Sequence, residues 1–346
     1  MNSKIPPPRK PRPPAAARPS TPRTQPRVRN APKRAVAPSP SLLARWFPNV
    51  DWTHVRERLE QYAILARMHR PVGAVLLLWP TYWALWLAAG DFPPAGALII
   101  FTLGVFLMRS AGCVINDFAD RKLDPQVERT RDRPLAAGRV TPREAIGVFV
   151  TLLALAFGLV LLTNKLTVEL SLVGAFLAAT YPFVKRYTYL PQVYLGCAFG
   201  WSIPMAFAAV KGGDWIAFKA ALPLCGLLFL ANVLFSTIYD TEYAMVDRDD
   251  DIKAGAKSTA ILFGDADLVI LGVLMATFLF AMLLAAQRAH LHWIYFAGVG
   301  MAAALFAYQQ WLMRNRDRDA CFAAFRNNAW VGGVLWVGIV LGYAVK

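Results

Sequence analysis

The sequence predicts an all-α membrane protein that crosses the bilayer about nine times. Of its 346 residues, 56% are hydrophobic and only 17% are charged, whereas soluble domains carry nearer to about a quarter charged residues. The apolar residues also gather in runs of about twenty, which is the length that an α-helix needs to cross the hydrocarbon core. Low charge and long apolar runs together indicate a polytopic membrane protein.

Residues 1–40 form a basic, proline-rich tail that we expect to be disordered and cytoplasmic. They hold ten Lys and Arg residues, no acidic residue and half of the 24 prolines. This composition lacks the apolar side chains that build a core, and it lacks the apolar stretch of a secretory signal. The arginines are typical of mitochondrial transit peptides, but the prolines disfavour the amphipathic helix that those peptides need. Anionic lipid, and not nucleic acid, is the expected partner of this charge.

Residues 41–70 are expected to lie along the membrane interface ahead of the first span. Within them, residues 52–69 predict an amphipathic helix, because Val55, Leu59, Tyr62 and Ala66 fall on one stripe. Aromatic residues just before this stretch suit the headgroup region of a bilayer. We therefore expect the helix to lie in the plane of the interface.

Residues 71–346 are expected to form the transmembrane domain. The predicted spans are residues 72–90, 95–115, 144–163, 166–184, 191–210, 216–238, 267–287, 292–312 and 328–345. Orientation follows from the short loops, because basic residues favour the cytoplasmic side. Lys and Arg gather in alternate loops, at residues 121–143, 185–186, 248–257 and 314–326. The amino terminus and these loops are therefore predicted to face the cytoplasm.

Two acidic clusters interrupt this apolar chain, and both follow a predicted span on the same side. The first acidic cluster is residues 116–124, in which Asn116, Asp120 and Asp124 fall at i, i+4 and i+8 of a helix, with Asp117 beside them. Like charges so closely spaced repel one another, and a bound cation relieves the repulsion. Oxygen ligands without a complete cage suit Mg²⁺, which leaves positions for substrate phosphates.

The second acidic cluster is residues 240–251, in which Asp247 and Asp251 are again four residues apart and Asp240 precedes them. Two oxygen-rich clusters at one membrane face predict two metal positions around one diphosphate. A single cluster of this kind is more often a helix cap or a solvated face. Two clusters on the same side, each with cations nearby, are harder to explain in that way.

A diphosphate also needs direct cationic partners. Arg131 and Arg133 follow the first cluster, Lys257 follows the second, and Arg109 lies inside a span seven residues before Asn116. An intramembrane arginine is a functional candidate, with snorkelling to the interface as the alternative. The basic residues in the loops, Arg131, Arg133 and Lys257, are equally well explained as determinants of membrane topology. The fourth span ends with Tyr181 and the loop residues Lys185 and Arg186, whose guanidinium fork suits a carboxylate.

No other metal or nucleophile pattern appears. The four cysteines, Cys113, Cys197, Cys225 and Cys321, are scattered without metal spacing, and none of the four histidines is close in sequence to an acidic cluster. We therefore expect the cysteines to pack as small apolar residues, and we expect neither zinc nor histidine-dependent nucleophilic catalysis.

The two clusters resemble the aspartate motifs of the UbiA superfamily of intramembrane prenyltransferases. The matching runs are Asn116-Asp117-x-x-Asp120-x-x-x-Asp124 and Tyr239-Asp240-x-x-Tyr243-Ala244-x-x-Asp247-x-x-Asp250-Asp251. Supporting runs are Arg70-Pro-Val-Gly, Tyr181-Pro-Phe-Val-Lys-Arg-Tyr, Gly200-Trp-Ser-Ile-Pro-Met-Ala-Phe and Lys257-Ser-Thr-Ala-Ile-Leu-Phe-Gly. The resemblance extends from about residue 60 to the carboxyl end and is strongest to the bacterial branch that prenylates 4-hydroxybenzoate. The basic tail is a departure from the family.

The resemblance implies a bundle of nine helices around a central cavity that opens sideways to the bilayer. It implies Mg²⁺ as cofactor, with a polyprenyl diphosphate donor and 4-hydroxybenzoate as acceptor. It implies a bacterial inner membrane with a cytoplasmic active site, in preference to the mitochondrial inner membrane. The implied catalytic carboxylates are Asp120, Asp124, Asp247 and Asp251, and the implied metal ligands are these four with Asn116, Asp117 and Asp240. Tyr181 and Lys185 match diphosphate contacts, and Arg186 matches the arginine that holds the aromatic carboxylate.

The two acidic clusters are compatible with three alternatives. A divalent-cation transporter would place its acidic residues near the bilayer midplane in broken helices, whereas both clusters here lie at the ends of spans. A CDP-alcohol phosphotransferase has an aspartate pattern that begins Asp-Gly and includes Ala-Arg, and this sequence lacks that pattern. A prenyltransferase of the same superfamily with a different acceptor stays open.

Overall fold

The apolar runs of the sequence fold into long α-helices, and the described residues contain no strand. The computed structural model describes residues 50–126, 130–184 and 186–345. The tail predicted for residues 1–40 lies outside them. The helices are α2 (Trp52–Leu65), α3 (Val72–Ala89), α4 (Ala95–Asp120), η1 (Asp124–Gln126), α5 (Pro142–Val160), α6 (Lys165–Val184), α7 (Pro191–Gly200), α8 (Ser202–Lys211), α9 (Trp215–Ala254), α10 (Thr259–Phe263), η2 (Gly264–Ala266), α11 (Asp267–Arg288), α12 (Tyr295–Met313) and α13 (Arg318–Ala344).

Helix length and composition confirm a multi-pass membrane protein. Within the described ranges, seven helical segments are long and apolar enough to cross a bilayer, namely α3, α4, α5, α6, α7 with α8, α9, and α10 with α11. Each coincides with one of the first seven predicted spans. The last two predicted spans, 292–312 and 328–345, coincide with α12 and α13. These two helices are not among the segments that are both long and apolar enough to cross a bilayer. The count of nine spans therefore stays a prediction.

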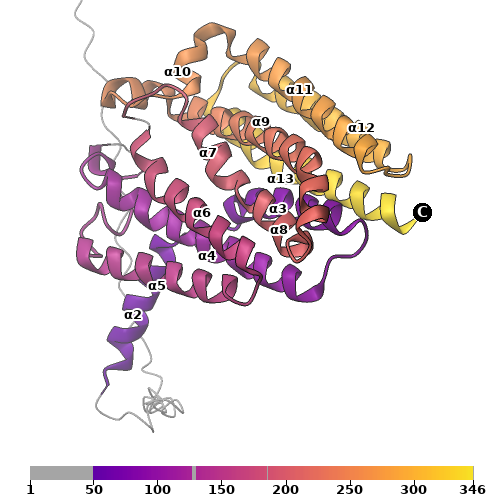
Figure 1. Ribbon diagram of the computed structural model, residues 1–346. Helices are drawn as coiled ribbons and strands as arrows, with labels where there is room; N and C mark the ends of the chain where they lie inside the picture. Colours follow the sequence, from indigo (N-terminus) through magenta and orange to yellow (C-terminus); the bar gives the residue numbers. More distant parts are fainter. Residues whose placement is uncertain (1–49, 127–129, 185, 346) are drawn as a thin grey trace, which may run out of the picture. The chain divides into compact units, whose positions relative to one another are not determined.

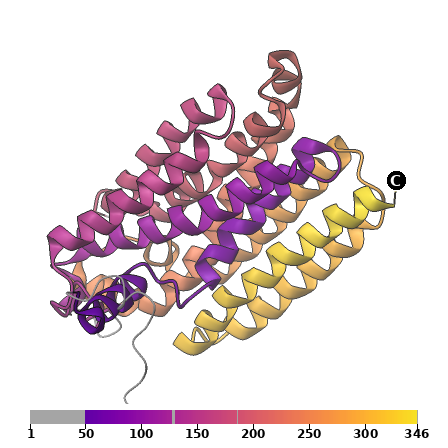
Figure 2. The same cartoon turned by 90° about the horizontal axis from the view of Figure 1, so that it is seen from below.

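Helix α9 runs through the middle of the bundle. It packs against α7, α8, α11 and α13, with α4, α5 and α6 on one side and α11 and α12 on the other (Figure 1). Helices α12 and α13 lie side by side along their length (Figure 2). Because α9 also carries the second acidic cluster, its packing fixes where those carboxylates lie.

Aromatic rings fill the core between α3, α9 and α11. Trp83, Phe235 and Phe278 are fully buried, with ring centroids 5.6 Å apart for Trp83–Phe235 and 5.1 Å for Phe235–Phe278. The Trp83 Nε1–H donates to the Gly332 carbonyl at 3.1 Å, which joins α3 to α13. No larger residue fits at position 332 without displacing Trp79, because a Cβ on Gly332 would lie 2.3 Å from Trp79 Cδ1.

The two acidic clusters adopt different backbones. The second cluster is helical throughout, because α9 continues 16 residues beyond the predicted end at residue 238, to Ala254; Gly255 then ends the helix in the left-handed region at φ 68°. The first cluster is helical only to Asp120, and Asp124 follows in η1. The prediction that Asp124 continues the helix face of Asn116 and Asp120 is therefore wrong.

Helix α2 is fastened to the start of α5. The Glu144 Oε1 atom accepts a hydrogen bond from Tyr62 Oη at 2.8 Å and an ion pair from Arg58. Glu144 also completes a capping box with Thr141, so one carboxylate serves both helices. The predicted helix over 52–69 is confirmed as far as Leu65, and its placement in the membrane interface stays a prediction.

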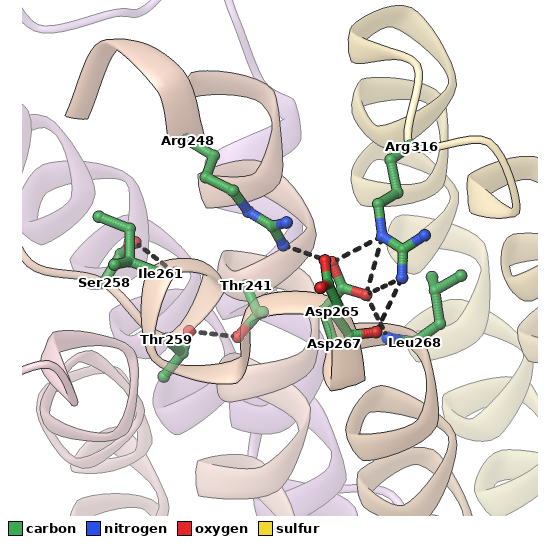
Figure 3. A network of polar contacts seen from close by, with 9 residues as sticks. All are labelled: Thr241, Arg248, Ser258, Thr259, Ile261, Asp265, Asp267, Leu268 and Arg316. Carbon is green, nitrogen blue, oxygen red and sulfur yellow. Dashed lines mark hydrogen bonds and ion pairs between the residues drawn. The ribbon is translucent and has the colours of Figure 1, made fainter. Parts of the chain in front are cut away.

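A polar network holds the carboxyl-terminal part of α9 in place. Arg248 on α9 and Arg316 in the loop before α13 converge on the fully buried Asp267, at the start of α11 (Figure 3). Arg316 Nη2 lies 2.8 Å from Asp267 Oδ1. Nearby, Thr241 and Thr259 are hydrogen-bonded at 2.6 Å, which joins α9 to α10. The network fixes the segment that carries Asp247.

Candidate active site

A cavity of about 860 Å³ lies among the helices that carry the two acidic clusters. One end is polar and the rest is mostly apolar. Six of the predicted site residues line it: Arg109, Asn116, Asp117, Arg133, Tyr181 and Asp240. The first four come from α4 and the loop before α5, and the others from α6 and α9. Residues far apart in the sequence therefore meet at this one site.

Two arginines neutralise the first acidic cluster. Asp117 is almost fully buried, and its Oδ1 atom accepts from Arg67 Nη2 at 2.8 Å and from Arg133 Nη1 at 3.0 Å. The same Arg133 nitrogen lies 2.9 Å from Asp124 Oδ2, so it bridges both carboxylates. Buried carboxylates need compensation of this kind.

Tyr181 lines the cavity within electrostatic reach of both clusters. Its side chain, on α6, interacts electrostatically with Asp120 of the first cluster and Asp240 of the second, and with Arg109. Asp120 is 3% exposed. The expectation that both clusters serve one site is consistent with this arrangement, because Asn116, Asp117 and Asp240 line the same cavity.

Arg109 reaches its position because Gly73 on α3 leaves room for it. Arg109 Nη1 donates to Cys113 Sγ at 2.6 Å within α4. A Cβ at Gly73 would lie 2.5 Å from Arg109 Nε and Nη2, so any larger residue must displace the guanidinium. Gly73 ends the Arg70-Pro-Val-Gly run, and this close approach gives that run a physical role.

The other carboxylates of the second cluster do not line the cavity. Asp247 is 8% exposed, and Asp251 is half-buried one helical turn further along α9. Arg318 of α13 pairs with Asp250 at 3.1 Å and lies 3.9 Å from Asp249. Asp120 and Asp124 of the first cluster are likewise not among the lining residues.

Several predicted basic residues are not brought to the cavity wall. Arg131 is exposed, 3.9 Å from Asp132. The Lys257 ammonium donates to the Tyr187 carbonyl at 3.2 Å and lies over the Tyr189 ring. Arg186 Nη2 donates to the Ala119 carbonyl at 2.8 Å, where it caps α4. Lys185 lies outside the described residues.

The donor chemistry of the clusters fits a hard divalent cation. Across the described part of the chain, no three His, Cys, Asp or Glu side chains are close enough together to hold a metal ion. The available ligands are nevertheless carboxylate and amide oxygens, which Mg²⁺ prefers. The bridging Arg133 nitrogen shows that a positive charge between Asp117 and Asp124 is favourable.

The pKa of the Asp124 carboxyl is shifted by its surroundings. Burial raises its pKa above the ordinary value, and the Arg133 guanidinium opposes that shift. Asp117 and Asp120 add to the rise through like-charge repulsion. A second cation would stabilise the ionised form, in agreement with a metal-binding role.

Sequence reasoning missed Arg67 and an aromatic wall. Arg67 lines the cavity from the loop after α2, with its backbone in the left-handed region at φ 54°, a conformation that is uncommon outside glycine. Its position beside Arg70-Pro-Val-Gly was the available signal. The wall is formed by Tyr239, Tyr243, Phe322 and Phe325, with Tyr243 and Phe325 centroids 4.8 Å apart.

Comparison with known proteins gives a consistent result. The profile of the UbiA prenyltransferase family matches residues 77–336. Among curated proteins, the 4-hydroxybenzoate octaprenyltransferase of Alkalilimnicola ehrlichii is 56% identical over 288 residues, which is 83% of this chain and 96% of that protein. The enzyme of the same name from Xylella fastidiosa is 58% identical over 289 residues, covering 83% and 94%.

Solved structures resemble the fold. The apo structure of a UbiA homologue from Aeropyrum pernix superimposes with a TM-score of 0.69 at 25% identity, covering 78% of this chain and 97% of that one. A UbiA homologue from Archaeoglobus fulgidus, solved bound to GPP and Mg²⁺, has a TM-score of 0.61 at 17% identity and covers 82% and 99%.

Proposed function

The chain belongs to the UbiA prenyltransferase family, and on this premise we propose that it prenylates 4-hydroxybenzoate. It transfers a polyprenyl group from polyprenyl diphosphate to the ring carbon ortho to the hydroxyl, which gives 3-polyprenyl-4-hydroxybenzoate for ubiquinone biosynthesis. The names of relatives at 56–58% identity, matched over most of their length, support this acceptor. A different aromatic acceptor within the same family is the second candidate.

One observation carries the proposal: residues of two acidic clusters more than a hundred residues apart, Asn116 and Asp117 of the first and Asp240 of the second, line one cavity that has a polar end and an apolar remainder. A polyprenyl diphosphate has the same division between a charged head and a hydrocarbon tail. A cation transporter does not need the apolar part. The cavity therefore favours a lipid-linked diphosphate as substrate.

We assign Mg²⁺ to the carboxylate and amide oxygens of both clusters. Bound there, it would supply positive charge to the departing diphosphate. The ligands in this assignment are Asn116, Asp117, Asp120, Asp124, Asp240, Asp247 and Asp251. The support from this structure is the burial of Asp117, Asp120, Asp124 and Asp247, and the Arg133 guanidinium that bridges Asp117 and Asp124.

Basic and tyrosine side chains are assigned to the diphosphate of the donor. We assign diphosphate contacts to Arg109, Arg131, Arg133, Tyr181, Lys185 and Lys257, of which Arg109, Arg133 and Tyr181 line the cavity. Their charges and hydrogen bonds stabilise the negative charge that develops as the allylic C–O bond breaks.

The allylic cation must be protected until the ring carbon attacks. The wall of Tyr239, Tyr243, Phe322 and Phe325 excludes water and offers π faces to positive charge. After the carbon–carbon bond forms, the ring loses a proton to Asp247 or to the departing diphosphate. We further propose that the protein lies in a bacterial inner membrane with this site on the cytoplasmic side.

A transfer assay tests the proposed function. Membranes containing the protein are incubated with ring-labelled 4-hydroxybenzoate, a polyprenyl diphosphate and Mg²⁺, and label in the lipid extract is measured. We expect transfer with Mg²⁺, none with excess chelator, and recovery when Mg²⁺ is restored. Transfer that persists in chelator would contradict the metal assignment. No transfer with any donor would overturn the function.

Replacing Arg186 tests its proposed contact with the aromatic carboxylate. A hydrogen-bonded charge contact is worth about 1.5–3 kcal/mol, so Arg186→Ala should raise the KM for 4-hydroxybenzoate by about tenfold or more. The KM for the donor should stay nearly constant. Arg121→Ala is the matched control, because Arg121 donates to the Phe118 carbonyl at the same end of α4. If the KM for 4-hydroxybenzoate is unchanged, or changes equally in both variants, Arg186 does not bind the aromatic carboxylate and only caps α4.

A further inference from the structure

The cavity extends from its polar end into an apolar limb, defined here by the lining residues Gly104 and Met108 of α4, Phe157 and Val160 of α5, and Gly174 of α6. A donor whose diphosphate lies at the polar end extends its prenyl tail into this limb, and we propose that Gly104 determines how long a tail can pass. The inference rests on the proposed function, which supplies a donor with its diphosphate at the polar end. It adds a residue that sets specificity for tail length.

The limb is long enough to select among tails. Both Asn116 and Ile100 line the cavity from α4, and at ~1.5 Å per residue they are about 24 Å apart along the helix axis. Gly104 lies about 18 Å from Asn116 on the same scale. The cavity therefore runs beside most of the length of a membrane-crossing helix.

Gly104 is an open point on this path, as is Gly112, which lines the cavity nearer to the polar end of α4. A Cβ built at Gly104 would have no atom within 4 Å, so a side chain there would enter empty space in the limb. Gly174 on the opposite wall is tighter, since its Cβ would lie 3.0 Å from Trp201 Cδ1. Bulk added at Gly104 would thus narrow the limb without first displacing a neighbour.

Tail length decides which donors meet Gly104. An isoprene unit adds four main-chain bonds, or about 5 Å when extended, given carbon–carbon bonds of about 1.5 Å. A geranyl tail of about 10 Å ends before Gly104, whereas an octaprenyl tail of about 40 Å must pass it. A compact, charged aromatic acid would not fill a long apolar limb.

The test compares Gly104→Leu with Gly96→Leu. Both glycines lie in α4 and both would place a Cβ in open space, but Gly96 is exposed and does not line the cavity. Leucine is a good helix former, so neither change weakens the helix. The kcat/KM of each protein is measured with geranyl, farnesyl, geranylgeranyl and octaprenyl diphosphates, with 4-hydroxybenzoate as acceptor.

We expect Gly104→Leu to lower kcat/KM for octaprenyl diphosphate by about tenfold or more, with less than about a twofold change for geranyl diphosphate. Gly104→Ala should give a smaller change with the same dependence on length, and Gly96→Leu should match the unmodified protein. An equal loss at every tail length, or no loss at any length, would overturn the inference. A rise in the KM for 4-hydroxybenzoate alone would also overturn the inference, because it would mean that the limb binds the acceptor and not the prenyl tail. An unmodified protein that is inactive with every donor would instead contradict the proposed function.

Discussion

Replacing Asp120 or Asp247 with alanine is expected to lower kcat by about a thousandfold or more, because each removes a buried carboxylate from the proposed metal and diphosphate site. Asp120 is 3% exposed on α4 and Asp247 is 8% exposed on α9. One residue comes from each acidic cluster. If the clusters act as one site, the two losses should be similar and the double variant should be little worse than either single variant.

Two further variants make this test selective. Asp120→Asn and Asp247→Asn keep the shape of the side chain and remove its charge, so they should lose activity while the protein folds normally. Asp249→Ala is the matched control, since Asp249 belongs to the second cluster but its side chain is 73% exposed. Turnover is measured in the transfer assay, and folding is checked by size-exclusion chromatography. Full turnover in either asparagine variant would contradict a two-cluster mechanism.

The second large effect is expected on stability, from Asp267→Ala. Asp267 is fully buried and pairs with Arg248 and Arg316, whose side chains are 19% and 37% exposed. Removing one partner of a buried ion pair costs about 3–5 kcal/mol, because the remaining charges lose their compensation. The partial exposure of the arginines places the expected loss near the lower end, at about 3 kcal/mol. The melting midpoint of the purified protein should therefore fall by several degrees.

An exposed pair provides the comparison for Asp267. Arg56 and Glu60 are joined at 3.0 Å on α2, with side chains 83% and 59% exposed. Glu60→Ala should leave the melting midpoint almost unchanged, because exposed pairs contribute little. An Asp267→Ala protein as stable as the Glu60→Ala protein would mean that the network in Figure 3 does not hold α9 and α11 together.

Much of the fold was predictable, because a membrane-crossing helix is specified locally by its own apolar length. The spans expected at 72–90 and 166–184 match α3 and α6 to within about a residue. Helix ends beyond the apolar runs were not predictable in this way. The extension of α9 through Asp247 to Ala254 depends on tertiary contacts such as Arg248 with Asp267, which leave no periodic signal in the sequence.

The candidate site was predictable to a smaller extent. The spacing of the carboxylates identified both clusters. Charged groups next to lipid are unfavourable in free energy, so their presence at the ends of spans indicates a function. Arg67 was missed because its role depends on a loop that places it 2.8 Å from Asp117, fifty residues further along the chain. Arg131 is exposed beside Asp132 and not in the cavity wall. Proximity in sequence to the first cluster does not determine which way a loop side chain points, and the diphosphate role of Arg131 stays a prediction.

The most direct test of the account is mass spectrometry of the reaction products. The protein is given 4-hydroxybenzoate and other aromatic acids, each with a set of polyprenyl diphosphates, and every lipid-soluble product is identified. The account predicts a product with the mass of 4-hydroxybenzoate plus one prenyl group minus one hydrogen, with the prenyl group on the carbon ortho to the hydroxyl. A prenyl group found on oxygen, or 4-hydroxybenzoate left unmodified while another acid is prenylated, would contradict it.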